Sequence, residues 1–292
     1  MELGKWLDTW IALYVEPSGL AASTKAMYCR AVEAVPLELA QHDLRTLSAL
    51  DLLPWLLSVA AKHPRAAQLD RQMLSRSLGL AAKLQLCSAG IVDPDTLPMP
   101  RHQPKRAVVL QAVEAAAYVA EARRGGYRCG LLLILCLVCG LRRGEALGLQ
   151  RRDIDAAGVL QVVRQRQRIR GHYGAVPLKS ASARRALQLP ADVLAWVSSA
   201  PRCLGGWVVD ATPEQMQADH VAILTAAGLP RCTIHGLRHT MATMAAGAGV
   251  SIKLLQVALG HAHYGLTADL YAGHAYPPSG APALVWQGVR AV

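Results

Sequence analysis

A proline-rich basic segment limits what this chain can fold into. Four prolines fall within Asp93–Arg106, together with four basic residues. Prolines at this density break helices and central strands, so the stretch is typical of an extended linker. We therefore expect two folded units joined by a linker and followed by a tail. The units are expected at residues 1–97 and 108–276, the linker at 98–107 and the tail at 277–292.

The first unit is predicted to be all helical. Apolar residues recur at helical spacing from Trp6 to Tyr14. Leu- and Ala-rich stretches predict longer helices at about residues 47–61 and 67–86. The pair Ser23-Thr24 is expected to cap a further helix, because hydroxyl side chains accept hydrogen bonds from the first turn.

The second unit is predicted to mix helices with a few strands. Between residues 155 and 189 the apolar period changes to alternation, with turns expected at Gly171 and Gly174. Strands are expected at Val176–Lys179 and Arg185–Leu189. Helices are expected at about residues 110–123, 127–139, 143–150, 191–198, 213–227, 237–248 and 252–259. The fold class is therefore mainly α with a small antiparallel β-sheet (α+β), in two domains.

The charge balance points to a polyanionic partner. Lys and Arg exceed Asp and Glu by 11, and 24 of the 31 basic residues are Arg. The guanidinium group grips phosphate through two parallel hydrogen bonds, which suits a nucleic acid. A genome rich in G and C would also favour Arg codons, so the Arg/Lys ratio alone does not decide between the two explanations.

Membrane and secreted classes are disfavoured. The longest apolar run, Leu131–Val138, is far shorter than the roughly 20 residues of a membrane span. The N-terminus has no basic start followed by an apolar stretch, as a secretion signal would. Seven cysteines at irregular spacing suit reduced thiols in the cytoplasm. Cys136 and Cys139 have the spacing of a redox or zinc pair, but they lie in an apolar helical run, so a structural role is expected.

Four short segments of the second unit carry residues suited to phosphate chemistry. In chain order they are Gly140-Leu141-Arg142-Arg143-Gly144-Glu145, Pro177-Leu178-Lys179-Ser180, His235-Gly236-Leu237-Arg238-His239, and Leu259-Gly260-His261 with Tyr271 ten residues beyond the histidine. His235 and Arg238 are three apart, so on a helix they share one face. Glu145 stands three residues after Arg142 and can hold its guanidinium by a carboxylate pair.

In the order and spacing of these segments the chain resembles the tyrosine recombinases, the phage integrase family. The helical first unit is similar to the core-binding domain of that family, so the resemblance covers nearly the whole chain. It implies a site-specific DNA recombinase or integrase of a mobile element or chromosome. Such an enzyme cuts and rejoins DNA strands through a 3′-phosphotyrosyl intermediate, without metal, ATP or another cofactor.

The resemblance also assigns roles to single residues. Arg142 and Arg238 would hold the non-bridging phosphate oxygens, with Glu145 supporting an arginine from behind. Lys179 would protonate the leaving 5′ oxygen, and Tyr271 would be the nucleophile. Two histidines complete the set: His261 would hydrogen-bond a non-bridging oxygen, while His235 would orient the phosphate or accept the proton of Tyr271.

Partners and location follow from the same resemblance. The enzyme would bind double-stranded DNA at recombination core sites and act as a homo-tetramer on two synapsed duplexes. It would be a monomer or weak oligomer when free, in the bacterial cytoplasm at the nucleoid. The helical unit starts within the first residues, so no additional N-terminal DNA-binding domain is expected. The apolar stretch Ala283–Trp286 would dock on a neighbouring protomer or pack on its own chain.

Each assignment has an alternative. Arg143 competes with Arg142, and both suit a solvated helix start. Lys179 suits a solvated hairpin, and His235 and His239 have metal-ligand spacing, although Gly236 stands where zinc proteases carry Glu. His239 suits a core or cap position. Tyr264 and Tyr276 compete with Tyr271. At the level of function the alternatives are a type IB topoisomerase and a non-catalytic DNA-binding protein derived from an integrase.

Overall fold

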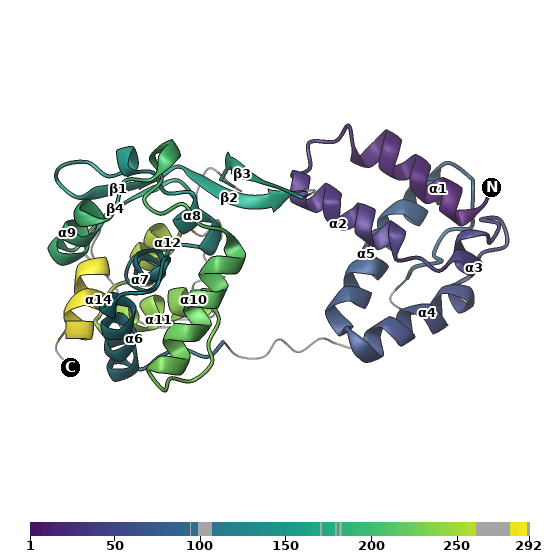
Figure 1. The fold of residues 1–292 in the computed structure, drawn as a ribbon. Coiled ribbons are helices and arrows are strands. Elements are labelled where there is room, and N and C mark those ends of the chain that lie inside the picture. The colour runs from purple at the N-terminus through teal and green to yellow at the C-terminus, as the bar shows by residue number, and fades with distance from the viewer. Residues whose placement is uncertain are drawn as a thin grey trace. The chain divides into compact units, whose positions relative to one another are not determined.

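The protein folds into two compact units, residues 1–105 and 106–292, each with its own hydrophobic core. The structure is a computed structural model that describes residues 1–93, 95–98, 107–169, 171–178, 180, 183–260 and 281–290. Most of the expected linker lies outside these ranges. Helices dominate both units, and the strands are few and antiparallel, as the sequence predicted (Figure 1).

The first unit contains only helices among its described residues. Helix α1 (Leu3–Trp10) runs directly into a π-helical turn, η1 (Ile11–Val15). Four further helices follow: α2 (Ala22–Glu33), α3 (Leu37–Ala40), α4 (Ala49–Lys62) and α5 (Pro64–Lys83). The expected cap at Ser23-Thr24 is wrong. The carbonyl of Ala21 already accepts the backbone N–H of Lys25 at 3.1 Å, so both residues lie inside the first turn of α2.

Tryptophans of α1 anchor the core of the first unit. The indole N–H of Trp6 donates to the carbonyl of Ser77 on α5 at 3.2 Å, so the polar group of this buried side chain has a hydrogen-bond partner. The ring of Trp10 meets Tyr28 of α2 edge-on, with centroids 5.3 Å apart. Leu97 is fully buried in the same core. The packed core of the unit therefore includes Leu97.

The second unit is built around one apolar helix, α7 (Gly130–Val138), all nine residues of which are buried. A helix that is apolar on every face needs neighbours on every side. It packs against α6 (Ala112–Arg124), α8 (Arg143–Leu147), α10 (Pro213–Ala226), α11 (Ile234–Gly247) and α14 (Ala281–Arg290). The unit also holds α9 (Ala191–Ser199), α12 (Ile252–Leu259) and the 3-10 turns η2 (Arg151–Asp153) and η4 (Leu204–Gly206).

The strands form two antiparallel pairs rather than one sheet. Strand β1 (Val159–Val162) pairs with β4 (Arg185–Gln188), and β2 (Arg164–Ile169) pairs with β3 (His172–Pro177). Gly171 turns the β2–β3 hairpin with φ +81°, a backbone conformation that favours glycine. The expected turn at Gly174 is wrong, because this glycine lies within β3 and faces Gln167 across the ladder.

The cysteines are unpaired in this fold. Cys129, Cys136 and Cys139 are buried, and the other four are partly exposed. Burial raises the pKa of the Cys139 thiol to about 12, which leaves it without thiolate character at neutral pH. No helix within the described ranges has both the length and the apolar character needed to cross a bilayer.

The C-terminal apolar stretch is part of helix α14, which packs on its own chain. Val285, Trp286 and Val289 are buried in the second core, where α14 contacts α6 and α11. The indole of Trp286 donates to the carboxylate of Asp192 on α9 at 3.3 Å, and Arg290 reaches the same carboxylate at 2.8 Å. Of the two expectations for Ala283–Trp286, the structure shows packing within the chain.

We predict that Trp286→Ala lowers the free energy of unfolding by about 3–5 kcal/mol, because truncating a buried aromatic ring leaves a cavity. Urea denaturation of the whole chain measures the change. Leu284→Ala on the same helix is the control, since Leu284 is 38% exposed. Equal losses for the two variants would show that α14 does not belong to this core.

Candidate active site

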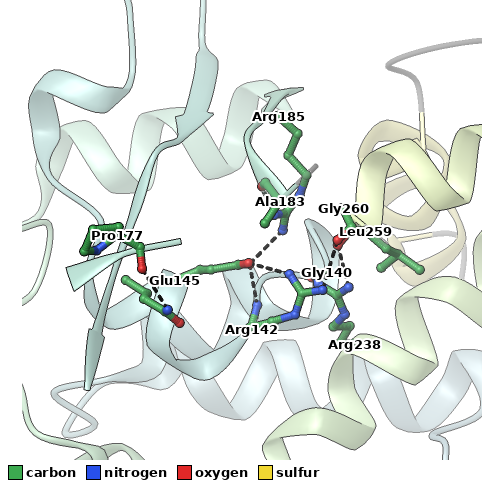
Figure 2. Close-up of polar contacts among 10 residues, drawn as sticks. Gly140, Arg142, Glu145, Pro177, Ala183, Arg185, Arg238, Leu259 and Gly260 are labelled. Atoms are coloured by element: carbon green, nitrogen blue, oxygen red, sulfur yellow. Dashed lines mark hydrogen bonds and ion pairs between the residues drawn. The ribbon is translucent and has the colours of Figure 1, made fainter. Parts of the chain in front are cut away.

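The structure brings Arg142, Glu145 and Arg238 together and adds Arg185 from β4 (Figure 2). Arg142 stands immediately before α8, Glu145 lies in its first turn and Arg238 lies in the middle of α11. His235 is one turn before Arg238 on α11. Lys179, His261 and Tyr271 lie outside the described residues, as do the alternative nucleophiles Tyr264 and Tyr276.

Arg142 is held by a carboxylate and a helix end. Its Nη1 donates to Glu145 Oε1 at 2.7 Å and its Nη2 to the carbonyl of Gly260 at 3.1 Å. The backbone N–H of Arg142 also donates to Glu145 Oε2 at 2.9 Å. The same carboxylate thus caps α8 and fixes the side chain that precedes it. About a third of the Arg142 side chain, 35%, remains exposed.

Arg238 is buried against two helix C-termini. Its Nη1 donates to the carbonyl of Gly140 at 2.6 Å, just beyond α7, and its Nη2 to the carbonyl of Leu259 at 2.5 Å, the last residue of α12. Helix C-terminal carbonyls carry partial negative charge and lack partners within the helix, so a cation there is favoured. Gly140 has φ +63°, and a Cβ at this position would meet Leu259 Cδ2 at 2.9 Å. The positive φ favours glycine at this position, and the Leu259 side chain would have to shift to admit a Cβ.

Arg185 is the residue that the sequence analysis did not assign. Its Nη2 donates to Glu145 Oε2 at 2.8 Å and its Nη1 to the carbonyl of Ala183 at 3.0 Å. The side chain is only 1% exposed. The alternation of buried and exposed residues along β4 places Arg185 inward, next to an exposed Arg184. An arginine that points inward from a strand needs a carboxylate partner, because burying an unpaired charge is unfavourable. The alternation along the strand was therefore the sequence feature that could have indicated a role for Arg185.

The cluster carries more positive than negative charge. Arg142, Arg185 and Arg238 contribute three positive charges and Glu145 one negative charge, which leaves an excess of two. Burial alone would raise the pKa of Glu145, but the hydrogen bond and charge of Arg185, followed by those of Arg142, outweigh it and lower the pKa. Burial, together with the charges of Arg142 and Arg185, lowers the pKa of Arg238 to about 9, so the group stays charged at neutral pH. Such a site is suited to bind an anion.

Two histidines flank this cluster on α11. Their rings, His235 and His239, pack edge to face with centroids 4.7 Å apart. Although the residue His235 is exposed, desolvation of the ring and then the charges of His239, Arg238 and Arg142 lower its pKa to about 4. The ring is therefore neutral at pH 7 and able to accept a proton. Within the described ranges, no set of three or more His, Cys, Asp or Glu side chains surrounds a possible metal position.

Comparison of the sequence with known proteins identifies a family. The sequence model of the phage integrase family matches residues 108–277. The tyrosine recombinase XerC of Rhodospirillum centenum is 35% identical over 178 residues, which cover 58% of this chain and 49% of that protein. XerC 2 of Ralstonia nicotianae is 30% identical over 193 residues, covering 58% and 50%. The chain therefore spans about half the length of the curated relatives it matches.

Solved structures share the fold. The integrase of transposon Tn1549 in complex with a circular intermediate DNA superposes with a TM-score of 0.79 at 19% identity, covering 94% of this chain and 95% of that one. A lambda integrase tetramer bound to a Holliday junction gives 0.71 at 19% identity, covering 93% and 77%. At this identity the likeness concerns the fold.

We predict that Arg185→Met lowers the free energy of unfolding by about 3–5 kcal/mol at pH 7, because the buried carboxylate loses one of its two ion-pair partners. Urea denaturation measures the loss. Arg184→Met is the matched control, since it changes the exposed arginine immediately before β4. A similar loss in the control, or none in Arg185→Met, would contradict a structural role for the Arg185–Glu145 pair.

We predict that the imidazole of His235 titrates near pH 4, not near 6.5, in the folded protein. NMR of histidine-labelled protein, assigned with His235→Gln, measures the midpoint. Because the folded pKa lies below the unfolded one, this group contributes stability above pH 6.5 that is lost as the pH falls toward 4. The acid loss of stability should therefore be smaller in His235→Gln. A midpoint near 6.5 would contradict the shift.

Proposed function

Because the chain belongs to the phage integrase family, we propose that it is a site-specific DNA recombinase. It would cut and rejoin DNA strands through a 3′-phosphotyrosyl intermediate. The observation that carries the proposal is the cluster of Arg142 and Arg238, which is held in place by one carboxylate and three helix-end carbonyls and keeps an excess of positive charge. A DNA phosphate is an anion that would balance it.

The two arginines are proposed to bind the scissile phosphate. Each guanidinium has five N–H donors, and the contacts described above engage two of them on Arg142 and two on Arg238. The remaining donors suit the non-bridging oxygens, where negative charge accumulates as the phosphorus is attacked. Since the donors are already fixed by Glu145 and the helix ends, little reorganisation accompanies the reaction. They would supply the charge that metal ions supply in other phosphoryl-transfer enzymes.

The remaining steps are assigned to residues of the family pattern. The phenolic oxygen of Tyr271 attacks the phosphorus, and the bond from phosphorus to the 5′ oxygen breaks. Lys179 donates a proton to that leaving oxygen, and His261 hydrogen-bonds a non-bridging oxygen. The DNA remains esterified to Tyr271, so the bond energy is conserved and a 5′-hydroxyl of a second strand can reverse the step. No ATP is needed for this exchange.

For His235 the electrostatics favour one of the two expected roles. A pKa of about 4 means that the ring is neutral at physiological pH, with a free nitrogen that can accept a hydrogen bond from the phenol of Tyr271. The negative charge of a bound phosphate would raise the pKa of this ring and so strengthen it as a base. A neutral ring contributes no full charge to phosphate binding. We therefore propose that His235 is the proton acceptor and that Arg142 and Arg238 supply the positive charge.

The proposed partners are two DNA duplexes and three further copies of the chain. Each protomer supplies one nucleophile, and exchange between two duplexes breaks four strands. A lambda integrase tetramer bound to a Holliday junction shares the fold. The curated relatives come from bacteria, so we place the reaction in the bacterial cytoplasm, at the nucleoid.

We predict that the wild-type chain forms a covalent adduct with a nicked duplex and that Tyr271→Phe forms none, because the attacking oxygen is absent. The duplex carries a site selected from a random-sequence pool by binding to this protein. Denaturing gel electrophoresis measures the adduct, and Tyr264→Phe is the control that keeps it.

The same site in two-duplex and supercoiled substrates separates the alternatives. Exchange between two sites supports a recombinase, whereas relaxation of supercoils without exchange would support a type IB topoisomerase. Binding with no adduct would support a non-catalytic DNA-binding protein.

A further inference from the structure

The arginines of strand β2 are engaged by acidic side chains. Arg164, Arg166 and Arg168 alternate along the strand and so share one of its faces. Their partners are Asp153 on η2, Asp210, whose Oδ1 lies 2.8 Å from Arg166 Nη1, and Glu214 on α10, whose Oε2 lies 3.5 Å from Arg168 Nη2. This face of β2 is therefore bonded to other elements of the second unit.

Arg166, the middle member, is the most enclosed. Its side chain is 11% exposed, against 52% for Arg168. Its guanidinium carbon lies 4.4 Å from the ring centroid of Tyr173 and 4.5 Å from that of Trp207. Two aromatic contacts and one carboxylate hold this cation, a combination worth far more than an exposed ion pair. Because Tyr173 is on β3 and Trp207 is not in the hairpin, Arg166 ties the hairpin to the rest of the unit.

The outer aromatic partner is itself fixed. Trp207 forms an antiparallel bridge with Gln150, and the N–H of Val208 donates to the carbonyl of Leu149 at 3.0 Å. Leu149 and Gln150 directly follow α8, the helix that positions Arg142 and Glu145. Trp207, one of the two aromatic partners of Arg166, is thus hydrogen-bonded to the segment that follows α8.

The hairpin also lies directly on α8. A Cβ at Gly148 would meet Gln165 Cα at 2.8 Å, and one at Gly144 would meet the carbonyl oxygen of Arg166 at 3.0 Å. Only a glycine pair lets the β2 backbone come this close to the helix. Arg166 therefore stands where β2 touches α8, and its side chain fixes the strand at that contact.

The strand that pairs with β2 leads to Lys179. Ala175 of β3 faces Arg166, and Pro177, the last residue of β3, faces Arg164. Gln165 Nε2 donates to the carbonyl of Pro177 at 3.0 Å, which fixes the end of the strand (Figure 2). Lys179 follows two residues later. The described contacts therefore fix β3 up to Pro177, two residues before this lysine in the sequence.

We propose that Arg166 is a positioning residue that, through the Tyr173–Trp207–Asp210 clamp, sets the place of Lys179 relative to the phosphate held by Arg142 and Arg238. The proposal rests on the function proposed above. Displacement of a catalytic group by about 1 Å can cost on the order of 10²-fold in rate. Loss of the clamp should therefore slow the step that needs the lysine proton more than any other step.

The test uses two nicked duplexes that carry the selected site and differ in one atom. One has the natural 5′ oxygen at the scissile bond, and the other has sulfur in its place. A thiolate leaves without a proton far more readily than an alkoxide, because it is a much weaker base. A thiol has a pKa of ~8.5, whereas water, which stands here for an alcohol, has a pKa of ~15.7. The sulfur duplex therefore makes the proton donor dispensable, and Lys179→Ala is the reference variant. Adduct formation by the wild type and its absence in Tyr271→Phe test the proposed function separately.

We predict that Arg166→Met cleaves the oxygen duplex about 10- to 100-fold more slowly than wild type and cleaves the sulfur duplex within about 3-fold of it. Arg168→Met is the matched control on the same face of β2, and both of its rates stay near wild type. The ratio of the two rates in one variant cancels effects on DNA binding and on the amount of folded protein.

Three results would overturn the inference while leaving recombinase activity intact. Equal losses on both duplexes in Arg166→Met would assign Arg166 to folding or DNA binding. Equal losses on both in Lys179→Ala would mean that the hairpin does not carry the proton donor. Unchanged rates for Arg166→Met on both duplexes would also refute the role of the clamp.

Discussion

One buried carboxylate organises the candidate active site. Glu145 accepts hydrogen bonds from the side chains of Arg142 and Arg185 and from the backbone N–H of Arg142, so it joins α8, β4 and the segment after α7. A single negative charge among three guanidinium groups leaves the site with an excess of two positive charges. Carbonyl groups at the ends of α7 and α12 accept hydrogen bonds from Arg142 and Arg238, and their partial negative charge lowers the free energy of burying these cations. The fold thus holds cations together that would otherwise repel, and in the proposed function a DNA phosphate would balance their charge.

Much of this architecture was predictable from local patterns. The all-apolar run at Leu131–Val138 predicted a central helix, and the change of period after residue 155 predicted antiparallel strands. Arg142, Glu145 and Arg238 were identified from ordered motifs, and the structure brings them together. The roles of Lys179, His261 and Tyr271 stay predictions, since these residues lie outside the described ranges.

The misses have physical reasons. Arg185 was given no role because its partner is a carboxylate 40 positions earlier in the chain, and the alternation along the strand indicates only that the side chain points inward. The carboxylate partners of the β2 arginines were likewise not predictable, because tertiary folding brings them near. The turn expected at Gly174 failed because glycine is also tolerated within a strand. The separate sheets likewise follow from long-range pairing of β1 with β4.

The glycine pair on α8 has a consequence for how such an enzyme can diversify. Gly144 in α8 and Gly148 at its C-cap leave no room for a side chain between helix and strand, so we expect neither position to accept a larger residue. Changes within the hairpin are instead expected at its exposed positions, which lack such close backbone contacts. A directed-evolution library for altered targeting would therefore gain by holding the two glycines constant and varying the exposed part of the hairpin.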